Sequence, residues 1–429
     1  MKIFKTTDNN FKNEFNEILA RGAMDIDNVS GIVKNILDEV KNEGNTALIR
    51  HISKFDKWTP TKSEDLKIST EEMAKAYENI DEKLKKALNL AFDRIKAYHE
   101  KQLPKSWLDF EDNGTILGQK VTPVSRAGVY VPGGKAFYPS SLLMNVIPAL
   151  VAGVKEIVVM TPVIENKPNE LLLAACHLCG VNEVYKVGGA SAIAALAYGT
   201  ETIKKVDVVT GPGNIFVATA KKLVYGEVNI DMIAGPSEIG IIADDSAKPN
   251  YMAIDLLSQA EHDEMASSIM ITTSEELAKN TKKEIYRFLN ELERKEIAQK
   301  SIEERGAIII AENLDEAITL MNEIAPEHLE IVTINPFELL PKIKNAGAIF
   351  LGENTPEPIG DYIAGPNHTL PTGGSAKFYS PLNVEVFMKK SSIISFSKQA
   401  ILDMGEDCAI LAKTEMLTAH QKSVLERLK

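Results

Sequence analysis

The chain has 429 residues, of which 44% are hydrophobic and 25% are charged, and its formal net charge at pH 7 is −12. This length supports two or three packed domains, and the composition argues against a largely disordered chain. The acidic balance opposes a general nucleic-acid or anionic-membrane surface, although it leaves room for a local basic pocket. We find no signal-peptide core and no run of about 18 apolar residues, so we expect a cytoplasmic protein.

Residues 1 to about 105 are rich in Lys and Glu and predict a helical N-terminal region. Helical periodicity runs through residues 28–56 and again through residues 70–102. His51 and His99 fall in these helices, and no acidic or cysteine partner stands at ligand spacing from them. We therefore expect both histidines to be surface or packing residues.

From Val121 the pattern changes to short Val- and Ile-rich strands that alternate with helices up to about residue 225. This alternation predicts an open parallel α/β sheet. Glycine-rich turns follow three of its strands, at residues 131–135, 187–190 and 211–214. Such turns expose backbone amides beside helix N-termini, which favours a nucleotide site, although glycines also serve turns that bind nothing. Neither G-x-G-x-x-G nor the P-loop motif is present.

Residues 228–262 predict a strand, a Gly-Pro turn, a second strand and an amphipathic helix from about residue 250 to 266. Gln259 and His262 stand three positions apart on the polar face of that helix, so both side chains could reach one ion or ligand. The imidazole is a good metal ligand, whereas the amide oxygen is a weak one. A solvated helix face is the open alternative for this pair.

The cysteines are too few for a disulfide framework, which fits a reducing compartment. Cys176 and Cys179 form a C-x-x-C inside an apolar helix pattern, and no second pair exists to complete a zinc site. We expect buried packing for this pair and an apolar helical setting for Cys408 as well.

From Ser267 to about residue 352 strands and helices alternate again and predict a second α/β unit. Glu327 and His328 are adjacent at a helix end, where a carboxylate and an imidazole could supply base chemistry. An exposed loop pair is the alternative. The following Gly- and Pro-rich loop, residues 356–375, carries Asp361 and His368, and its length favours a functional loop.

The tail from about residue 381 predicts a strand and then a helix that carries Glu415 and His420. It is too short to bury a core of its own. We therefore expect it to pack on another domain or another subunit.

Eight motifs stand in a fixed order along essentially the whole chain. They are RAGVYVPGGKAFYPS, VGGASAIAALAYGTE, VTGPGN, IDMIAGPSE, DLLSQAEH, APEHLE, GDYIAGPNHTLPTGG and EMLTAH. In this order they resemble the histidinol dehydrogenase family, whose members catalyse the last step of histidine biosynthesis. The resemblance implies two incomplete Rossmann-like parallel α/β domains, a helical N-terminal region and a small tail domain in a domain-swapped homodimer.

The expected domain borders follow from the same resemblance. They are an arm at 1–23, a discontinuous α/β domain at 24–129 and 238–380 with the metal and catalytic residues, an NAD-binding domain at 130–237, and a tail at 381–429 that contributes to the partner subunit's active site.

Carried over position by position, the resemblance implies one zinc ion per subunit, a catalytic pair and an NAD site. The implied zinc ligands are Gln259, His262, Asp361 and His420. The implied catalytic residues are Glu327 and His328. The implied substrate contacts are Ser237, Gln259, His262, His328, Asp361, His368, Glu415 and His420. The implied NAD contacts are Tyr130, Ser191 and Asn214, where position 191 departs from the family because its members usually carry Gln there.

The implied reaction is the NAD-dependent, four-electron oxidation of L-histidinol to L-histidine through L-histidinal. His328 would act as general base, Glu327 would activate water, and zinc would orient the substrate. A thiohemiacetal route would need an accessible thiol, which the sequence does not predict. One alternative is a related dehydrogenase of another small amino alcohol or diol, and a second is a non-catalytic zinc- or nucleotide-binding relative. The full set of implied residues favours histidinol.

Overall fold

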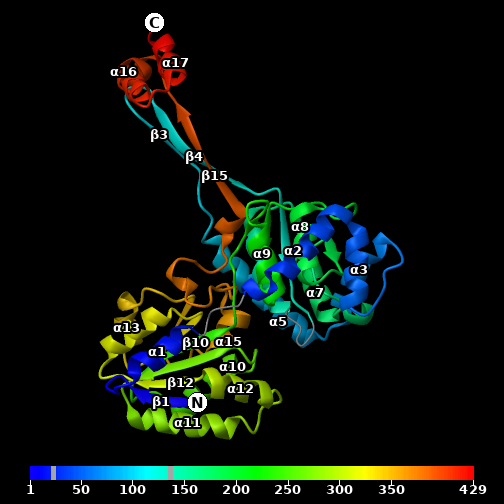
Figure 1. Cartoon of the computed structure of the whole chain (residues 1–429), viewed down its shortest axis with the longest axis vertical. Coiled ribbons are helices and arrows are strands. Elements are labelled where there is room, and N and C mark those ends of the chain that lie inside the picture. Colours follow the sequence, from blue (N-terminus) through cyan, green and yellow to red (C-terminus); the bar gives the residue numbers. More distant parts are fainter. Residues whose placement is uncertain (21–25, 134–138) are drawn as a thin grey trace.

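The computed structural model describes residues 1–20, 26–133 and 139–429. In this part of the chain, two six-stranded sheets and one three-stranded sheet organise the fold. Figure 1 shows two α/β units beside each other and a slender tail that points away from both. No helix of the described residues is long and apolar enough to cross a membrane.

The first six-stranded sheet, here called sheet A, is parallel throughout. In spatial order its strands are β1 (Lys2–Lys5), β12 (Ala307–Ile310), β11 (Ser267–Thr272), β10 (Glu238–Ala243), β13 (His328–Val332) and β14 (Ala348–Leu351). One face packs on α10 (Pro249–Ala260), α11 (Glu275–Phe288) and α12 (Lys295–Arg305). The other face packs on α1 (Phe11–Ala20), α13 (Leu314–Ile324) and the short α14 (Pro336–Leu339).

Coverage on both faces explains why the inner strands of sheet A read as almost continuous apolar runs. Gly240 in β10 shows how closely α13 approaches the sheet. A Cβ at this position would lie 2.5 Å from the sulfur of Met321 and 2.9 Å from Cγ of Pro326. Only a residue without a side chain lets the helix pack at this distance.

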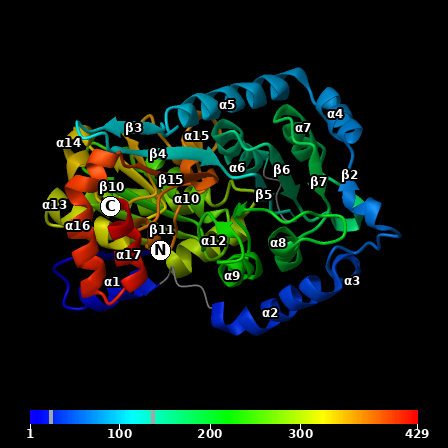
Figure 2. The ribbon, with the colours of Figure 1, turned by 90° about the horizontal axis from the view of Figure 1, so that it is seen from above.

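The second six-stranded sheet, sheet B, is parallel except for its edge strand β2. In spatial order its strands are β2 (Lys67–Ile68), β7 (Glu183–Tyr185), β6 (Glu156–Met160), β5 (Arg126–Tyr130), β8 (Val208–Thr210) and β9 (Asn229–Ile230). One face carries α4 (Thr70–Asn79), α5 (Glu82–Glu100), α6 (Pro139–Ala152) and α7 (Glu170–Leu178). The other carries α2 (Ile26–Glu43), α3 (Asn45–Phe55), α8 (Gly189–Tyr198) and α9 (Ile215–Val224), and Figure 2 shows the two helix layers on opposite sides.

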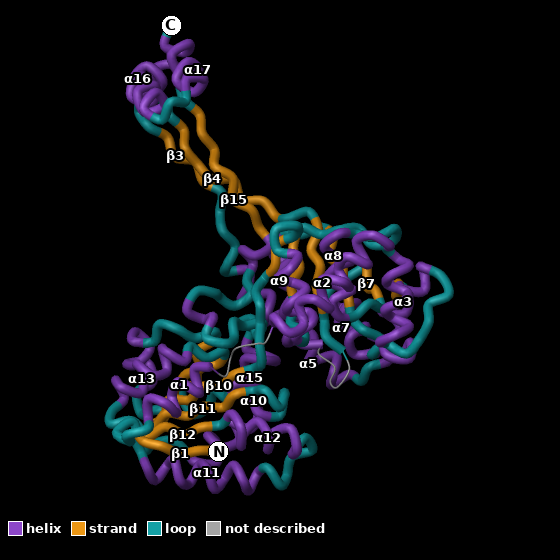
Figure 3. The backbone as a smooth tube through the Cα atoms, in the orientation of Figure 1, coloured by secondary structure: helices purple, strands orange, loops and turns teal. Residues whose placement is uncertain are grey.

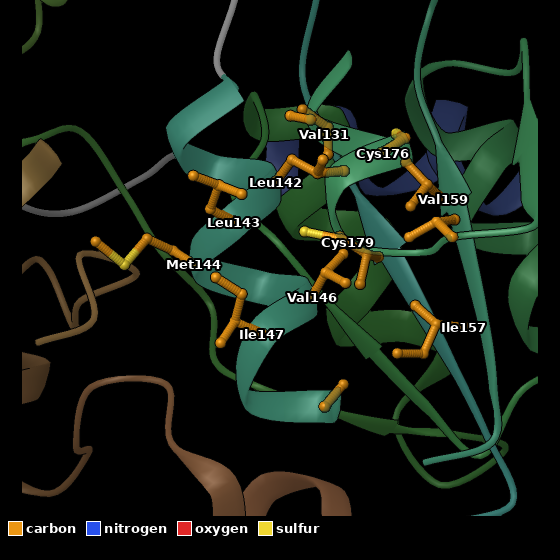
Figure 4. Packing of buried hydrophobic residues seen from close by; sticks show 14 of the residues in the cluster. Val131, Leu142, Leu143, Met144, Val146, Ile147, Ile157, Val159, Cys176 and Cys179 are labelled. Carbon is orange, nitrogen blue, oxygen red and sulfur yellow. The ribbon is translucent and has the colours of Figure 1, made fainter. Parts of the chain in front are cut away.

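The core between α6 and sheet B contains the cysteine pair. Figure 4 shows Leu142 and Val146 of α6 beside Cys179, with Cys176 and Val159 in the same cluster. Burial raises the pKa of Cys179 to about 12 and that of Cys176 well above the ordinary thiol value. The prediction of buried packing is confirmed for this pair. Cys408 lies in a helix, as expected, but it is exposed.

The tail is built on a three-stranded antiparallel sheet of β3 (Trp107–Phe110), β4 (Ile116–Pro123) and β15 (Met388–Ser395). Its long strands lead to α16 (Lys398–Thr414) and α17 (Thr418–Leu428), as Figure 3 shows. No residue of α17 is buried, and in α16 only three small residues are. The structure agrees that the tail buries no sizeable core, and it adds a hairpin from residues 107–123 that the sequence had not assigned to it.

The strand pairing divides the chain differently from the predicted borders. Residues 2–5 pair with β12 and so belong to the unit of residues 238–380. Residues 26–106 belong instead with residues 124–232, because β2 pairs with β7 and α4 and α5 share a core with α6 and α7. Periodicity locates the apolar stripe of a helix but does not say which sheet covers it. The predicted border at residues 23 and 24 lies outside the described residues, whereas the parallel α/β class is confirmed.

Candidate active site

The predicted catalytic residues lie at the amino ends of the strands of sheet A. His328 is the first residue of β13, and Ala348, which lines the same cavity, is the first residue of β14. Helix α10 connects β10 to β11 and therefore ends at this edge, with Gln259 in its last turn. The glycine turns of sheet B lie instead at strand carboxyl ends, where open parallel sheets usually bind their ligands.

A cavity of about 830 Å³ opens at this edge. His328, Asp361 and His368 face it from the unit of sheet A, and Tyr98 and Gln102 line it from α5 and the turn after it. His368 also bridges the two units, because its Nε2 lies 3.4 Å from Oγ of Ser141 at the start of α6. The site therefore lies where the two α/β units meet.

Glu327 and His328 are buried, so the alternative of an exposed loop pair is wrong. Nδ1 of His328 lies 3.1 Å from the carbonyl oxygen of Glu238 and 3.7 Å from a carboxylate oxygen of Glu327. A carbonyl only accepts hydrogen bonds, so Nδ1 carries the proton of the neutral ring. Nε2 is then the basic nitrogen, and it has no hydrogen-bond partner among the described residues.

Three carboxylates set the acidity of this pair. Burial alone would lower the pKa of His328, but Glu327, Asp361 and Glu357 raise it to about 10. Nε2 lies 3.6 Å from Asp361 and 3.7 Å from Glu357. Burial raises the pKa of Glu327 to about 7. Its Oε2 accepts a hydrogen bond of 2.9 Å from the backbone N–H of Glu238, which opposes this rise.

Of the predicted zinc ligands, Asp361 lines the cavity, and its charge acts on the His262 imidazole. Gln259 is 1% exposed and its Oε1 has no hydrogen-bond partner, so the alternative of a solvated helix face is wrong. Asp361 lies in a π-helical turn, Gly360–Ala364. Burial would raise the pKa of Asp361, but His328 and His368 hold it well below its usual range. Burial lowers the pKa of His262, which favours the neutral imidazole that binds metals.

The other predicted contacts differ in where they lie. Ser237 is half-buried and directly precedes β10, at the same strand edge. His420 and Glu415 are exposed in the projecting tail, so the chain does not bring them to its own cavity. His328, Glu357 and Asp361 offer ligand atoms within 4.8 Å of one another, a further set that could hold a cation.

Sequence reasoning missed two carboxylates beside His328, the buried Glu357 and the half-buried Glu238. Glu357, in the short helix α15 (Glu357–Ile359), is 1% exposed, and its Oε1 has no hydrogen-bond partner. Glu238 lies beside the catalytic pair at the start of β10. The only sequence signal for Glu238 was its place directly after Ser237 in the motif IDMIAGPSE.

The predicted NAD contacts lie at the carboxyl edge of sheet B. Tyr130 ends β5, and its hydroxyl accepts a hydrogen bond of 3.2 Å from the N–H of Gly189 at the start of α8. The side chain of Asn214 caps α9 by accepting hydrogen bonds from the backbone N–H groups of Phe216 and Val217. Ser191 is buried, and its hydroxyl lies 2.8 Å from Nδ1 of His51, so a cofactor would compete for it. His51 is thus a packing residue, one of the two roles expected for it.

The turn that ends at Asn214 is held rigidly. Gly211 has a φ of +115°, and a Cβ there would lie 2.0 Å from the carbonyl oxygen of Tyr130. Its N–H donates to Asp231 at 2.8 Å, and its carbonyl accepts from Lys221 at 2.9 Å. Lys221 and Asp231 also form a buried ion pair. Gly134 and Lys135 of the first glycine turn lie outside the described residues.

Comparisons with known proteins give the same assignment across the chain. The family profile of histidinol dehydrogenase matches residues 19–428. Histidinol dehydrogenase from Sulfurimonas denitrificans is 71% identical over 99% of both chains, and that from Helicobacter hepaticus is 62% identical over 97% of this chain and 96% of its own. This chain belongs to the histidinol dehydrogenase family. The crystal structure of histidinol dehydrogenase from Elizabethkingia anophelis superposes with a TM-score of 0.94 at 35% identity, covering 100% of this chain and 98% of that one.

Membership confirms the resemblance drawn from the eight motifs, and it makes the protein an oxidoreductase of histidine biosynthesis. The departure at position 191 from the histidinol dehydrogenase pattern now has a structural description. Ser191, His51 and Glu39 form a hydrogen-bonded chain, in which Nε2 of His51 lies 2.8 Å from the carboxylate of Glu39.

A buried carboxyl beside the predicted NAD edge gives a pH-dependent prediction. Asp56 is 6% exposed, and burial raises its pKa to about 6. Its pKa in the unfolded chain is about 3.9, so the folded state binds the proton more tightly and stability falls as pH rises between these values. We expect Asp56→Asn to raise the free energy of unfolding by about 2–3 kcal/mol at pH 8 and to leave it unchanged at pH 3.5.

Thermal unfolding at both pH values measures this effect. Asp38→Asn, at an exposed position of α2, is the matched control and should follow the wild type at both pH values. Equal melting temperatures of Asp56→Asn and wild type at pH 8 would contradict the prediction.

Proposed function

We propose that this protein oxidises L-histidinol to L-histidine with two molecules of NAD and keeps L-histidinal bound between the two steps. The observation that carries the proposal is the buried Glu327–His328 pair, in which His328 lines the cavity and its Nε2 has no hydrogen-bond partner among the described residues. In the first step this nitrogen takes the hydroxyl proton of histidinol while hydride passes from the same carbon to NAD. The products are the aldehyde, NADH and a protonated His328.

The second step needs water and a second base. Glu327 takes a proton from water as the water oxygen bonds to the aldehyde carbon, and His328 returns its proton to the aldehyde oxygen. The resulting hydrate loses a hydroxyl proton to His328 and a hydride to a second NAD, which leaves the carboxylic acid. A pKa of about 7 suits Glu327 to this exchange at neutral pH.

Zinc fits the donor set at the cavity. Gln259, His262 and Asp361 would hold it with His420 from a tail, and the unpartnered Oε1 of Gln259 supports this arrangement. A bound zinc ion supplies positive charge that orients the imidazole and amine of the substrate. The same charge would lower the pKa of His328 from about 10, and that imidazole would then be a base at neutral pH.

The exposed apolar surface of the tail supports a homodimer. Its large apolar side chains are exposed on the strands and on both helices. They include Phe110, Ile394, Ile410, Leu411 and Met416. A second copy would cover such a surface, and its cavity would receive the tail's Glu415 and His420.

The stoichiometry of NADH tests the proposed function. We expect close to two NADH per L-histidinol when the zinc-loaded protein consumes a limiting amount of substrate. The matched control is L-alaninol, which lacks the imidazole and should give no NADH. One NADH per histidinol would mean a simple alcohol dehydrogenase, and none would mean a dehydrogenase of another amino alcohol or diol, or a non-catalytic relative.

A further inference from the structure

We propose that Glu238 carries protons from Glu327 to solvent through a water-sized cavity on the side of sheet A away from the substrate. This inference rests on the proposed function, because it concerns the proton that Glu327 takes from water. It gives a role to a half-buried glutamate that the two oxidation steps leave unused.

Glu238 touches both members of the catalytic pair through its backbone. Its N–H donates to Oε2 of Glu327 at 2.9 Å, and its carbonyl oxygen accepts from Nδ1 of His328 at 3.1 Å. In the parallel register Ile239 lies beside His328, so Glu238 lies beside Glu327 at the strand ends. Glu327 directly precedes β13, and its charge acts on the Glu238 carboxyl, so the two side chains are close enough to interact.

The Glu238 side chain has the properties of a proton carrier. Its Oε2 is buried and has no hydrogen-bond partner among the described residues. Burial and the charge of Glu327 raise the pKa of Glu238 to about 8. The hydrogen bond from the N–H of Gly373 and the charge of His328 oppose this rise. Glu327, Gly373 and His328 are therefore the groups that surround the Glu238 carboxyl. Two adjacent carboxyls of similar pKa exchange a proton at little cost in free energy.

A second cavity lies next to this side chain. Its volume is about 20 Å³, and Glu238, Ser267 and Gly373 line it together with apolar side chains. A polar cavity of roughly 10–15 Å³ holds one water molecule. Ile18 and Leu19 of α1 form another part of its wall, and Leu19 is 41% exposed. The cavity therefore reaches from Glu238 toward solvent at α1, on the face opposite α10.

The proton balance explains why such a route is useful. After the hydration step Glu327 holds the proton of the added water and must lose it before the next turnover. In the proposed reaction the substrate occupies the large cavity that His328 lines. Glu238 passes its own proton to the cavity water, the water passes a proton to solvent, and the Glu238 carboxylate takes the proton from the Glu327 carboxyl. The relay breaks and forms O–H bonds only, and no electrons move.

The test compares proton release with hydride transfer in Glu238→Gln. This change keeps the backbone contacts and the shape of the side chain but removes its acidity. With L-histidinal and NAD as substrates, a pH-indicator dye reports protons while absorbance reports NADH. We expect kcat to fall about tenfold, the solvent isotope effect to rise, proton release to lag behind NADH, and KM for histidinal to stay within twofold.

A second variant keeps the test valid if Glu238→Gln does not fold. Leu19→Phe places bulk at the outer wall of the cavity without touching Glu238, and it should produce the same lag. Proton release in step with NADH and an unchanged isotope effect in both variants would overturn the relay, even if kcat fell. Wild-type protein that makes no NADH would instead refute the proposed function, so the two failures are distinguishable.

Discussion

Replacing His328 with Asn is expected to lower kcat about 10³-fold, because the change removes the nitrogen that takes the substrate's hydroxyl proton. Nε2 of His328 has no hydrogen-bond partner among the described residues, whereas Nδ1 holds the ring against the Glu238 carbonyl. The amide of Asn reaches the position of Nδ1 and preserves that contact. Steady-state rates of NADH formation with L-histidinol measure the loss.

Glu327→Gln is the matched control within the pair. It leaves His328 in place, so the first hydride transfer should proceed and the second should stall for want of a base for water. Rapid mixing of this variant should give a burst of one NADH per site, whereas His328→Asn should give no burst. A His328→Asn variant that retains more than a tenth of wild-type kcat would show that another group is the base.

The local parts of this site could be predicted from the sequence. Glu327 and His328 are neighbours, and His262 follows Gln259 by three positions, so short spacing was enough to propose each pair. The helix was predicted to continue to about residue 266, but α10 ends at Ala260 and His262 lies in the turn after it. The alternation of strands and helices was enough to predict parallel sheets. These features depend on residues that are close together in the chain.

The parts that depend on distant pairing could not be predicted. Nothing in residues 70–100 indicates that their apolar stripes pack on α6 and α7 rather than on sheet A. Glu238 and Glu327 are brought together by the register of β10 and β13, which no local pattern encodes. The hairpin of residues 107–123 likewise joins the tail only because β4 pairs with β15.

Mixing two inactive variants should restore about a quarter of wild-type activity if the tail completes the site of a partner subunit. His262→Ala disables the cavity of its own chain, and His420→Ala disables the tail of its own chain. After subunit exchange half of the dimers combine the two variants, and each mixed dimer has one cavity with an intact His262 that receives a tail with an intact His420. The other cavity of that dimer lacks both histidines.

The same experiment separates a crossing tail from one that folds back on its own chain. If each tail served its own cavity, every site in the mixed dimer would lack one histidine and no activity would return. The exposure of His420 and the absence of any buried residue in α17 favour the crossing arrangement. Each variant is assayed alone after the same unfolding and refolding cycle, which controls for activity regained without exchange. Recovery near a quarter in the mixture alone would place two chains in each active site.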